Sequence, residues 1–174
     1  GQAHALESLS QDFCIEFGRH TLSAESWLAG DRAKPLIVEI GFGMGHSTAA
    51  MARAMPAFRH LGIEVHPPGV GSLLSEVRDQ GITNLRIIQH DAVEVLETMI
   101  VSDSVHAFHI YFPDPWPKKR HQKRRLIQRN FVSLLASRLV SGGYLHCATN
   151  WEAYALDRKS TRLNSSHVSE SRMP

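Results

Sequence analysis

Five short apolar runs alternate with segments of helical spacing, and this alternation limits the fold more than any other feature. The runs are residues 36–40, 60–65, 85–89, 105–112 and 144–148. Short β-branched runs bounded by turn residues are typical of buried parallel strands. Strands that alternate with helices form open sheets with right-handed crossovers. The sequence therefore predicts an α/β fold: an open, mostly parallel sheet with helices on both faces.

The segments between and before these runs predict helices and one turn. We expect helices at residues 3–13, 21–29 (capped near Ser23), 46–55, 71–80, 93–100 and 125–139, with a turn at 67–70. The 174 residues suit one domain. We expect residues 1–34 to be an N-terminal extension and 35–155 the core. Residues 156–174 show no periodic pattern of apolar residues, so we expect them to be disordered and unable to complete a sheet. We expect this tail to be foreign sequence, and the chain to be truncated before it.

A glycine-rich turn follows the first run, reading Glu39-Ile40-Gly41-Phe42-Gly43-Met44-Gly45. Glycine lets a backbone approach a ligand closely. The dinucleotide fingerprint needs its third glycine where this chain has His46, and no Lys-Ser/Thr pair follows for a triphosphate. The turn by itself is equally consistent with tight packing between a strand and a helix.

Acidic residues stand at the ends of successive predicted strands, which is the edge where open parallel sheets bind ligands. Glu64 ends the second strand and is placed to accept the hydroxyls of a ribose, bidentately. Asp91 follows the third strand and is placed to bind the amino group of an adenine. Either acid could instead cap the helix that follows it. Together with Glu39 and the glycine turn, they favour a nucleoside site.

The segment Tyr111–Arg125 joins a strand end to a stiff corner and a basic run. Pro113, Pro115 and Pro117 restrict the backbone around Asp114 and Trp116. Residues 118–125 hold six of the 19 Lys/Arg of the chain, and acids outnumber bases elsewhere. A local positive charge suits a polyanion such as an RNA backbone, although a basic run can also be a plain solvated surface.

Other features limit the class of protein. Cys14 and Cys147 lie far apart without a CxxC pair, which indicates a reduced, cytoplasmic chain. The eleven histidines form no ligand spacing, so we expect no metal. No signal peptide or membrane-spanning run is recognised.

Several motifs make the chain resemble the bacterial tRNA (guanine-N7)-methyltransferase family, within the Rossmann-like class I methyltransferases that use S-adenosyl-L-methionine. The resemblance covers about residues 1–155. The motifs are the glycine turn, Gly62-Ile63-Glu64-Val65-His66, Pro68-Gly69-Val70-Gly71, His90-Asp91-Ala92-Val93-Glu94-Val95-Leu96 and Phe112-Pro113-Asp114-Pro115-Trp116-Pro117-Lys118-Lys119-Arg120-His121. The start of the chain, residues 1–7, is also similar to the segment that precedes the domain in that family.

The resemblance implies methyl transfer to N7 of the variable-loop guanine (tRNA position 46), with Asp114 catalytic and tRNA as partner. It implies a cofactor site at Glu39, Gly41, Gly43, Gly45, Glu64, Asp91, Ala92 and Asp114. Lys118 and Asn150 would contact substrate, although the family commonly has Asp at the second position. RNA would bind Arg120, His121, Gln122, Lys123, Arg124 and Arg125. By this resemblance, we expect the closing strands with the family's Thr-x-x-Glu motif to be missing from this chain.

Three alternatives remain. The first is a non-catalytic RNA-binding or partner subunit that keeps the fold. The second is a methyltransferase for another substrate, and the third a nicotinamide oxidoreductase. We expect no membrane contact; the sequence does not set the oligomeric state, although a monomer is slightly favoured.

Overall fold

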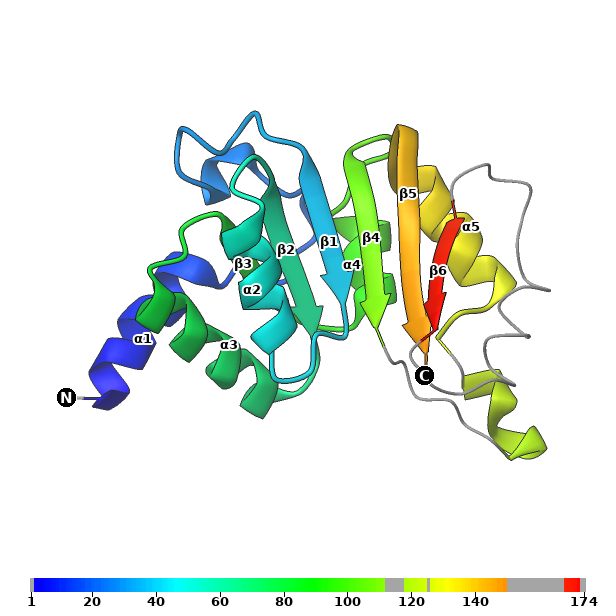
Figure 1. Ribbon diagram of the computed structural model, residues 1–174, viewed down its shortest axis with the longest axis horizontal. Coiled ribbons are helices and arrows are strands. Elements are labelled where there is room, and N and C mark those ends of the chain that lie inside the picture. Colours follow the sequence, from blue (N-terminus) through cyan, green and yellow to red (C-terminus); the bar gives the residue numbers. More distant parts are fainter. Residues whose placement is uncertain (1, 112–117, 125, 150–167, 173–174) are drawn as a thin grey trace.

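The computed structural model describes residues 2–111, 118–124, 126–149 and 168–172. Its elements, in chain order, are α1 (Gln2–Phe13), the 3₁₀ helix η1 (Ala24–Ser26), β1 (Leu36–Ile40), α2 (His46–Ala54), β2 (Arg59–Glu64), α3 (Pro67–Gln80), β3 (Leu85–Gln89), α4 (Ala92–Thr98), β4 (Val105–Tyr111), the 3₁₀ helix η2 (Lys119–Arg124), α5 (Arg129–Arg138), β5 (Leu139–Thr149) and β6 (Val168–Arg172). The strands form one sheet in the order β3-β2-β1-β4-β5-β6, with parallel pairing throughout (Figure 1). The predicted parallel α/β architecture is confirmed.

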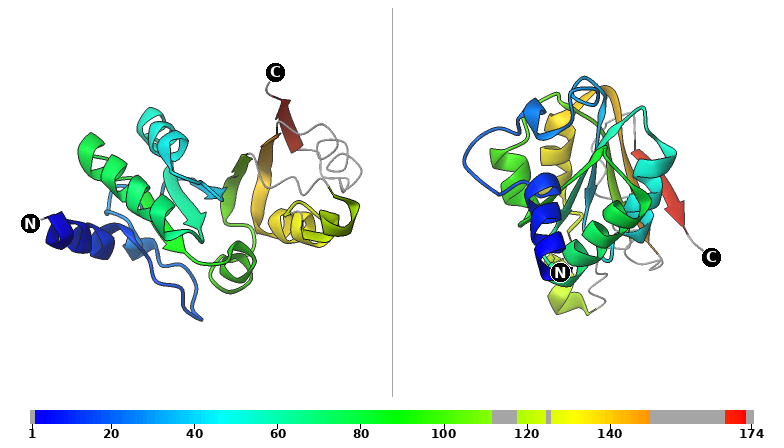
Figure 2. Two further views of the ribbon diagram at one scale, coloured as in Figure 1. Left: turned by 90° about the horizontal axis from the view of Figure 1, so that it is seen from below. Right: turned by 90° about the vertical axis from the view of Figure 1, so that its left-hand side faces the viewer.

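Helices cover both faces of the sheet. α2 and α3 lie on one face, while α4 and α5 lie on the other (Figure 2). The first face packs residues of α2 and α3 on Leu85 and Ile87 of β3. The second packs α4 and α5 on apolar residues of five strands, among them Val38, Ile63 and Phe108. Among the described residues, no helix is both long and apolar enough to cross a membrane.

The register of the central strands brings their carboxyl ends to one edge of the sheet. Ile40 of β1 pairs with Ile63 of β2 and with Ile110 of β4, and Glu64 of β2 pairs with Gln89 of β3. β1 is buried at all five positions, as expected for a central strand covered on both faces. The loops that follow these strands therefore meet at one place, which is the predicted ligand edge.

Several predicted boundaries differ from the structure; β5, for example, begins at Leu139 and not at residue 144 as predicted. Three further differences have a clear physical reason. α3 already begins at Pro67, where we expected a turn, because prolines in the first helical turn lose no intrahelical hydrogen bond. α5 begins at Arg129 because the preceding basic residues form the separate η2. Residues 21–29 hold only the three-residue η1, although Ser23 caps it as expected, its Oγ accepting the N–H of Glu25 at 3.2 Å.

The prediction that residues 156–174 would be disordered and unable to join a sheet is wrong for Val168–Arg172. These residues form β6, which pairs with β5 from Leu145 to Thr149. The prediction relied on side-chain pattern alone, whereas an open strand edge offers backbone N–H and C=O groups to any extended segment. The other proposed domain boundaries stay predictions.

Candidate functional site

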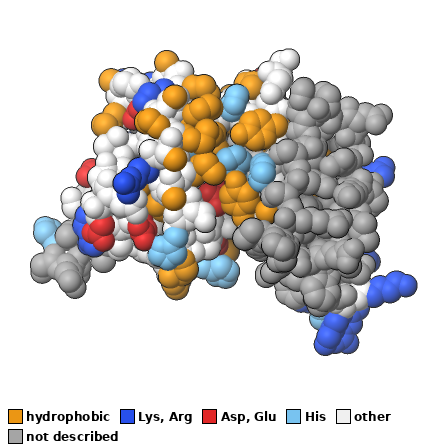
Figure 3. Space-filling view, in the orientation of Figure 1, with side chains coloured by type: hydrophobic (Ala, Val, Ile, Leu, Met, Phe, Trp, Pro, Cys, Tyr) orange, Lys and Arg blue, Asp and Glu red, His pale blue; other side chains and the backbone are white. Residues whose placement is uncertain are grey.

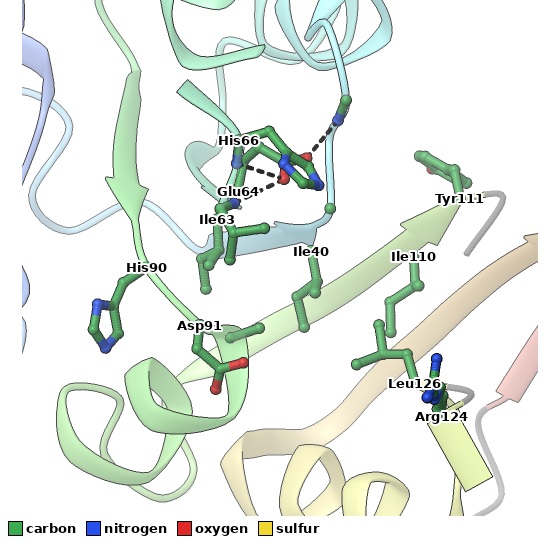
Figure 4. Close-up of a pocket in the computed structure, with 14 residues that line it drawn as sticks. Ile40, Ile63, Glu64, His66, His90, Asp91, Ile110, Tyr111, Arg124 and Leu126 are labelled. Carbon is green, nitrogen blue, oxygen red and sulfur yellow. Dashed lines mark hydrogen bonds between the residues drawn. The ribbon is translucent and has the colours of Figure 1, made fainter. Parts of the chain in front are cut away.

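A cavity of about 370 Å³ opens at the carboxyl ends of β1 to β4 (Figure 4). Ile40, Ile63 and Ile110 form an apolar wall, and Glu64 and Asp91 are its carboxylates. Its other lining residues are Gly41, Gly43, Val65, His66, His90, Ala92, Tyr111, Arg124 and Leu126. An apolar surface with a few directed polar groups is the usual make-up of a small-molecule site.

The glycine turn between β1 and α2 is fixed by close contact with α3. Gly41, Gly43 and Gly45 all have positive φ, and Gly45 precedes the first residue of α2. A Cβ on Gly45 would lie 2.6 Å from the Cβ of Leu73, and a Cβ on Gly69 would lie 2.0 Å from the carbonyl oxygen of Gly43. Glycine is therefore required at Gly45 in the turn and at Gly69 in α3. A Cβ on Gly41 or Gly43 would meet nothing within 4 Å, so the backbone of the turn is open toward the cavity at these two residues.

Glu64 organises the cavity through three backbone hydrogen bonds. Its Oε2 accepts the N–H of Gly43 at 2.9 Å, while Oε1 accepts those of Val65 at 2.7 Å and His66 at 3.2 Å. A carboxylate offers about four lone-pair sites, so one acceptor site is left, at Oε2. A ribose hydroxyl can use that site without disturbing the loop. We expected Glu64 to accept both hydroxyls of a ribose, but this would require one of its three backbone hydrogen bonds to break.

Asp91 both caps a helix and lines the cavity. Its Oδ1 accepts the N–H of Glu94 at 3.1 Å at the start of α4. The side chain is exposed and points into the cavity from the β3 side (Figure 4). Beside it, His90 stacks on Phe17 with ring centroids 3.7 Å apart. The two alternative interpretations of Asp91 are therefore compatible, since capping uses one oxygen and leaves the other for a ligand.

Glu39 is not among the residues that line the cavity. The side chain is buried in β1, and burial raises the pKa of Glu39 to about 7, while the Thr48 hydroxyl offsets part of the rise. That hydroxyl is itself buried and makes no well-formed hydrogen bond among the described residues. Glu39 pairs in register with His109 of β4, whose pKa burial lowers to about 4. A direct contact of Glu39 with a ligand stays a prediction.

The sequence argument missed several residues that line the cavity, among them the polar residues His66, His90 and Tyr111. Each lies within two residues of a predicted strand end, so its position could have identified it as a site residue. The prediction instead chose only the acidic residues nearby. Burial raises the pKa of Tyr111 to about 12, and the charge of Glu39 adds to the rise. Tyr111 therefore stays neutral at ordinary pH, and its ring contacts those of His109 and His146.

The predicted RNA-binding segment separates into two parts. Lys118, Lys119, Arg120 and Lys123 are exposed on or beside η2, which projects from the body of the molecule; Lys and Arg side chains gather there in Figure 3. Arg124, at the end of η2, lines the cavity. Asp114, Arg125 and Asn150 lie outside the described residues, as does the side chain of Gln122, so their predicted roles stay predictions. Among the described residues, no group of three or more His, Cys, Asp or Glu could hold a metal ion.

Comparison with known proteins points to one family. A family described as "Putative methyltransferase" (Methyltransf_4) matches residues 33–170. The chain is 54% identical over 155 residues to the tRNA (guanine-N(7)-)-methyltransferase of Bordetella pertussis, covering 89% of this chain and 60% of that protein. It is 52% identical over 154 residues to the protein of the same name from Methylobacillus flagellatus, covering 88% and 64%. The chain thus spans about 60% of the length of these curated relatives.

Solved structures share the fold at low sequence identity. An rRNA methylase from Streptococcus thermophilus superposes with a TM-score of 0.55 at 16% identity, covering 92% of this chain and 78% of that one. A precorrin-6y C5,15-methyltransferase from Geobacter metallireducens gives a TM-score of 0.58 at 16% identity, covering 74% and 61%. These likenesses concern the fold alone.

Proposed function

The chain belongs to the methyltransferase family that matches residues 33–170, and we propose that it transfers a methyl group from S-adenosylmethionine to N7 of a guanine in tRNA. The names of its relatives support the substrate and the reaction. The observation that carries the proposal is the cavity at the strand ends, where a glycine turn, Glu64 and Asp91 meet. The variable-loop guanine, position 46, is the target we propose from the sequence motifs.

The cavity residues fit the nucleoside part of this cofactor. Glu64 keeps one acceptor site at Oε2 for a ribose hydroxyl, and Asp91 keeps one oxygen for the adenine amino group. The side chains of Ile40, Ile63 and Ile110 offer a flat apolar surface on which an adenine ring can pack. The open backbone at Gly41 and Gly43 leaves room for the methionine part. When bound, the cofactor supplies an electrophilic methyl group on a sulfonium.

The chemistry at the guanine needs little from the protein beyond positioning. N7 is a bare acceptor in the plane of the base and carries no proton, so attack on the methyl group requires no general base. The chain must hold N7 in line with the methyl group, which alone lowers the barrier substantially. We assign to Asp114 the stabilisation of the positive charge that develops on the base, or the holding of its N–H edge. The assignment is supported by Tyr111, three residues earlier in the sequence, which lines the cavity.

The basic segment 118–124 would hold the RNA backbone beside the cavity. Its lysines and arginines are exposed on a short projecting element, a suitable arrangement for phosphate contacts that tolerate different sequences. Arg120–Arg125 is thus the stretch we propose for tRNA binding, with Lys118 nearer the reacting base. Binding should weaken steeply as salt concentration rises.

The decisive experiment is methyl transfer from labelled S-adenosylmethionine to an unmodified tRNA transcript, with 7-methylguanine located by chemical cleavage. We expect cleavage at the variable-loop guanine, and a loss of transfer of at least about a hundredfold in Asp114→Ala. Cofactor and tRNA binding without transfer would favour the RNA-binding subunit instead. A chain that binds neither ligand would refute the proposal.

A further inference from the structure

A second cavity, of about 480 Å³, lies away from the strand ends that carry the candidate site. Its wall is formed by the end of α1, the residues around η1, and Arg86 near the start of β3. Arg86 is at the opposite end of β3 from His90 and Asp91, and the two cavities share no described residue. A cavity of this size is typical of a small-molecule site.

Arg86 is buried in the wall of this cavity, at 5% exposure, and only part of its guanidinium is hydrogen-bonded. Its Nε donates to the carbonyl oxygen of Ser26 at 2.6 Å, and Nη1 donates to those of Thr83 at 2.9 Å and Leu85 at 2.7 Å. The guanidinium carbon lies 4.8 Å from the centroid of the Phe13 ring. The other terminal nitrogen, Nη2, donates to no described residue, so two N–H groups of the fork are unused.

The positive charge of Arg86 has no direct counter-ion among the described residues. Burial lowers the pKa of Arg86, and the charges of Asp31 and Asp12 offset only part of this effect. Asp31 is instead paired with Lys34, at 2.5 Å. Three carbonyl oxygens orient the guanidinium but do not neutralise it, and buried charges in proteins are usually paired. A negatively charged ligand would supply the missing partner.

Other residues of the wall add to this chemistry. Arg32 is exposed, and its Nε donates to the carbonyl oxygen of Trp27 at 3.3 Å, which holds a second guanidinium at the cavity. The indole N–H of Trp27 is buried and makes no hydrogen bond within the described part of the chain. Asp12 and Glu25, the acids of the wall, are exposed. They make the surrounding surface unfavourable for a polyanion such as an RNA backbone, so the cavity suits a small anion.

We propose that this cavity binds a small oxyanion, a carboxylate or a phosphate, through Arg86 and Arg32. A guanidinium matches two oxygens of either group, and Nη2 of Arg86 is the unused donor. The site is independent of the proposed methyl transfer, because other residues form it at the other end of β3. An anion bound there would join α1, the segment around η1 and β3, and so stabilise the N-terminal extension on the sheet.

The test is a nuclear magnetic resonance titration of the full 174-residue chain with sodium phosphate and, separately, with sodium acetate, at an ionic strength held constant with chloride. The indole N–H signal of Trp27 reports on the cavity and is assigned by its loss in Trp27→Phe. Arg32→Met removes one anion-binding group, and Arg86→Lys keeps the charge but not the fork of donors. Arg19→Met is the matched control, because it removes a charge from an exposed residue of the N-terminal extension that does not line the cavity.

We expect a saturable shift with half-saturation on the order of 1 mM, as for a few charge-assisted hydrogen bonds. Arg19→Met should keep this value, whereas Arg32→Met and Arg86→Lys should raise it at least about fivefold. Saturation by phosphate alone, by acetate alone or by both identifies the class of oxyanion. If Arg86→Lys does not fold, Arg32→Met decides by itself. No saturable shift with either anion, or the same half-saturation in the unchanged chain and in Arg32→Met or Arg86→Lys, would overturn the proposal.

Discussion

The carboxylate of Glu64 holds the backbone N–H of Gly43 at 2.9 Å, so the acid that ends β2 fixes the turn that follows β1. The same side chain also accepts the N–H groups of Val65 and His66. Two neighbouring strand ends are thereby tied together by one buried residue. The cavity between them is organised before any ligand arrives, which reduces the cost of ordering on binding.

Glu64→Ala should weaken both the fold and the site. The substitution leaves three backbone N–H groups without their acceptor, and hydrogen bonds to a charged group contribute about 1.5–3 kcal/mol each. Water can enter the cavity and replace part of this, so we expect a loss of about 2–3 kcal/mol in the free energy of unfolding. Urea unfolding measures the loss, and calorimetry should show cofactor affinity reduced by at least about a hundredfold.

Glu64→Gln is the control for charge. An amide oxygen still accepts hydrogen bonds, but the NH₂ group that replaces the second oxygen faces another donor. We expect about half the destabilisation of the alanine variant. If Glu64→Gln unfolds like the unchanged chain, the carboxylate charge is not what holds the turn.

Gly69→Ala should disrupt the contact between α3 and the glycine turn. The added Cβ would lie 2.0 Å from the carbonyl oxygen of Gly43, which is backbone and cannot rotate away. Either helix or turn must shift, at a cost of about 1–3 kcal/mol. For a chain of this size the melting temperature should fall by roughly 3–10 °C, and the displaced turn should weaken cofactor binding.

Gly71→Ala, two residues further along the same helix, is the matched control. A Cβ at Gly71 would meet nothing within 4 Å. Because alanine favours a helix over glycine by about 1 kcal/mol, this variant should melt at the same or a higher temperature. Equal destabilisation by both substitutions would show that helix geometry, rather than the contact with Gly43, decides the effect.

The two roles of Asp91 can be separated by two substitutions. Asparagine caps a helix about as well as aspartate, whereas alanine does not, at a cost of about 1 kcal/mol. Asp91→Asn should therefore unfold like the unchanged chain yet bind the cofactor about tenfold more weakly, because the amide lacks the negative charge that attracts an amino group. Asp91→Ala should lose both properties. Parallel thermal melts and cofactor titrations check this, and unchanged affinity in both variants would remove Asp91 from the site.

The sequence was sufficient to predict the sheet and the edge that carries the site. Two strands, 36–40 and 85–89, match the predicted bounds, because short β-branched runs between turn residues leave few alternatives. Glu64 and Asp91 lie together because parallel strands end on one edge. Such features follow from local pattern and from topology, which a sequence carries directly.

What could not be predicted depends on contacts between distant segments. Nothing near Glu64 in the sequence shows that its second oxygen binds Gly43, 21 residues earlier. Arg124 looked like its basic neighbours, and only the position of η2 beside the cavity distinguishes it. Glu39 does not line the cavity whereas the neighbouring Ile40 does, because side chains alternate between the faces of a strand, and the predicted contact of Glu39 with a ligand stays a prediction.

Glu39 and His109 should give opposite pH dependences of stability that nearly cancel. In the folded chain Glu39 titrates at about 7 rather than 4.5, so it binds a proton more tightly when folded, and stability falls as pH rises from about 4.5 to 7. His109 titrates at about 4 rather than 6.5, so it sheds its proton on folding, and stability rises as pH rises from about 4 to 6.5. Each effect amounts to about 3 kcal/mol.

Single substitutions should reveal the two opposing slopes in urea unfolding between pH 4 and 7. Glu39→Gln leaves the effect of His109, so stability should rise by about 3 kcal/mol over this range. His109→Phe keeps an aromatic ring beside Tyr111 and His146, and leaves the effect of Glu39, so stability should fall by a similar amount. His60, whose pKa burial also lowers, is present in every variant and cancels in the comparison.

The double variant decides whether the two groups act independently. Independent groups predict a profile as flat as that of the unchanged chain, because both effects are removed together. Glu39 and His109 are cross-strand partners on adjacent strands, however, and a proton passed between them would make each pKa depend on the other. In that case the free energy of unfolding of each single variant would change less with pH than the pKa values of Glu39 and His109, taken independently, predict. Profiles of the single variants that parallel the unchanged chain would refute both assignments.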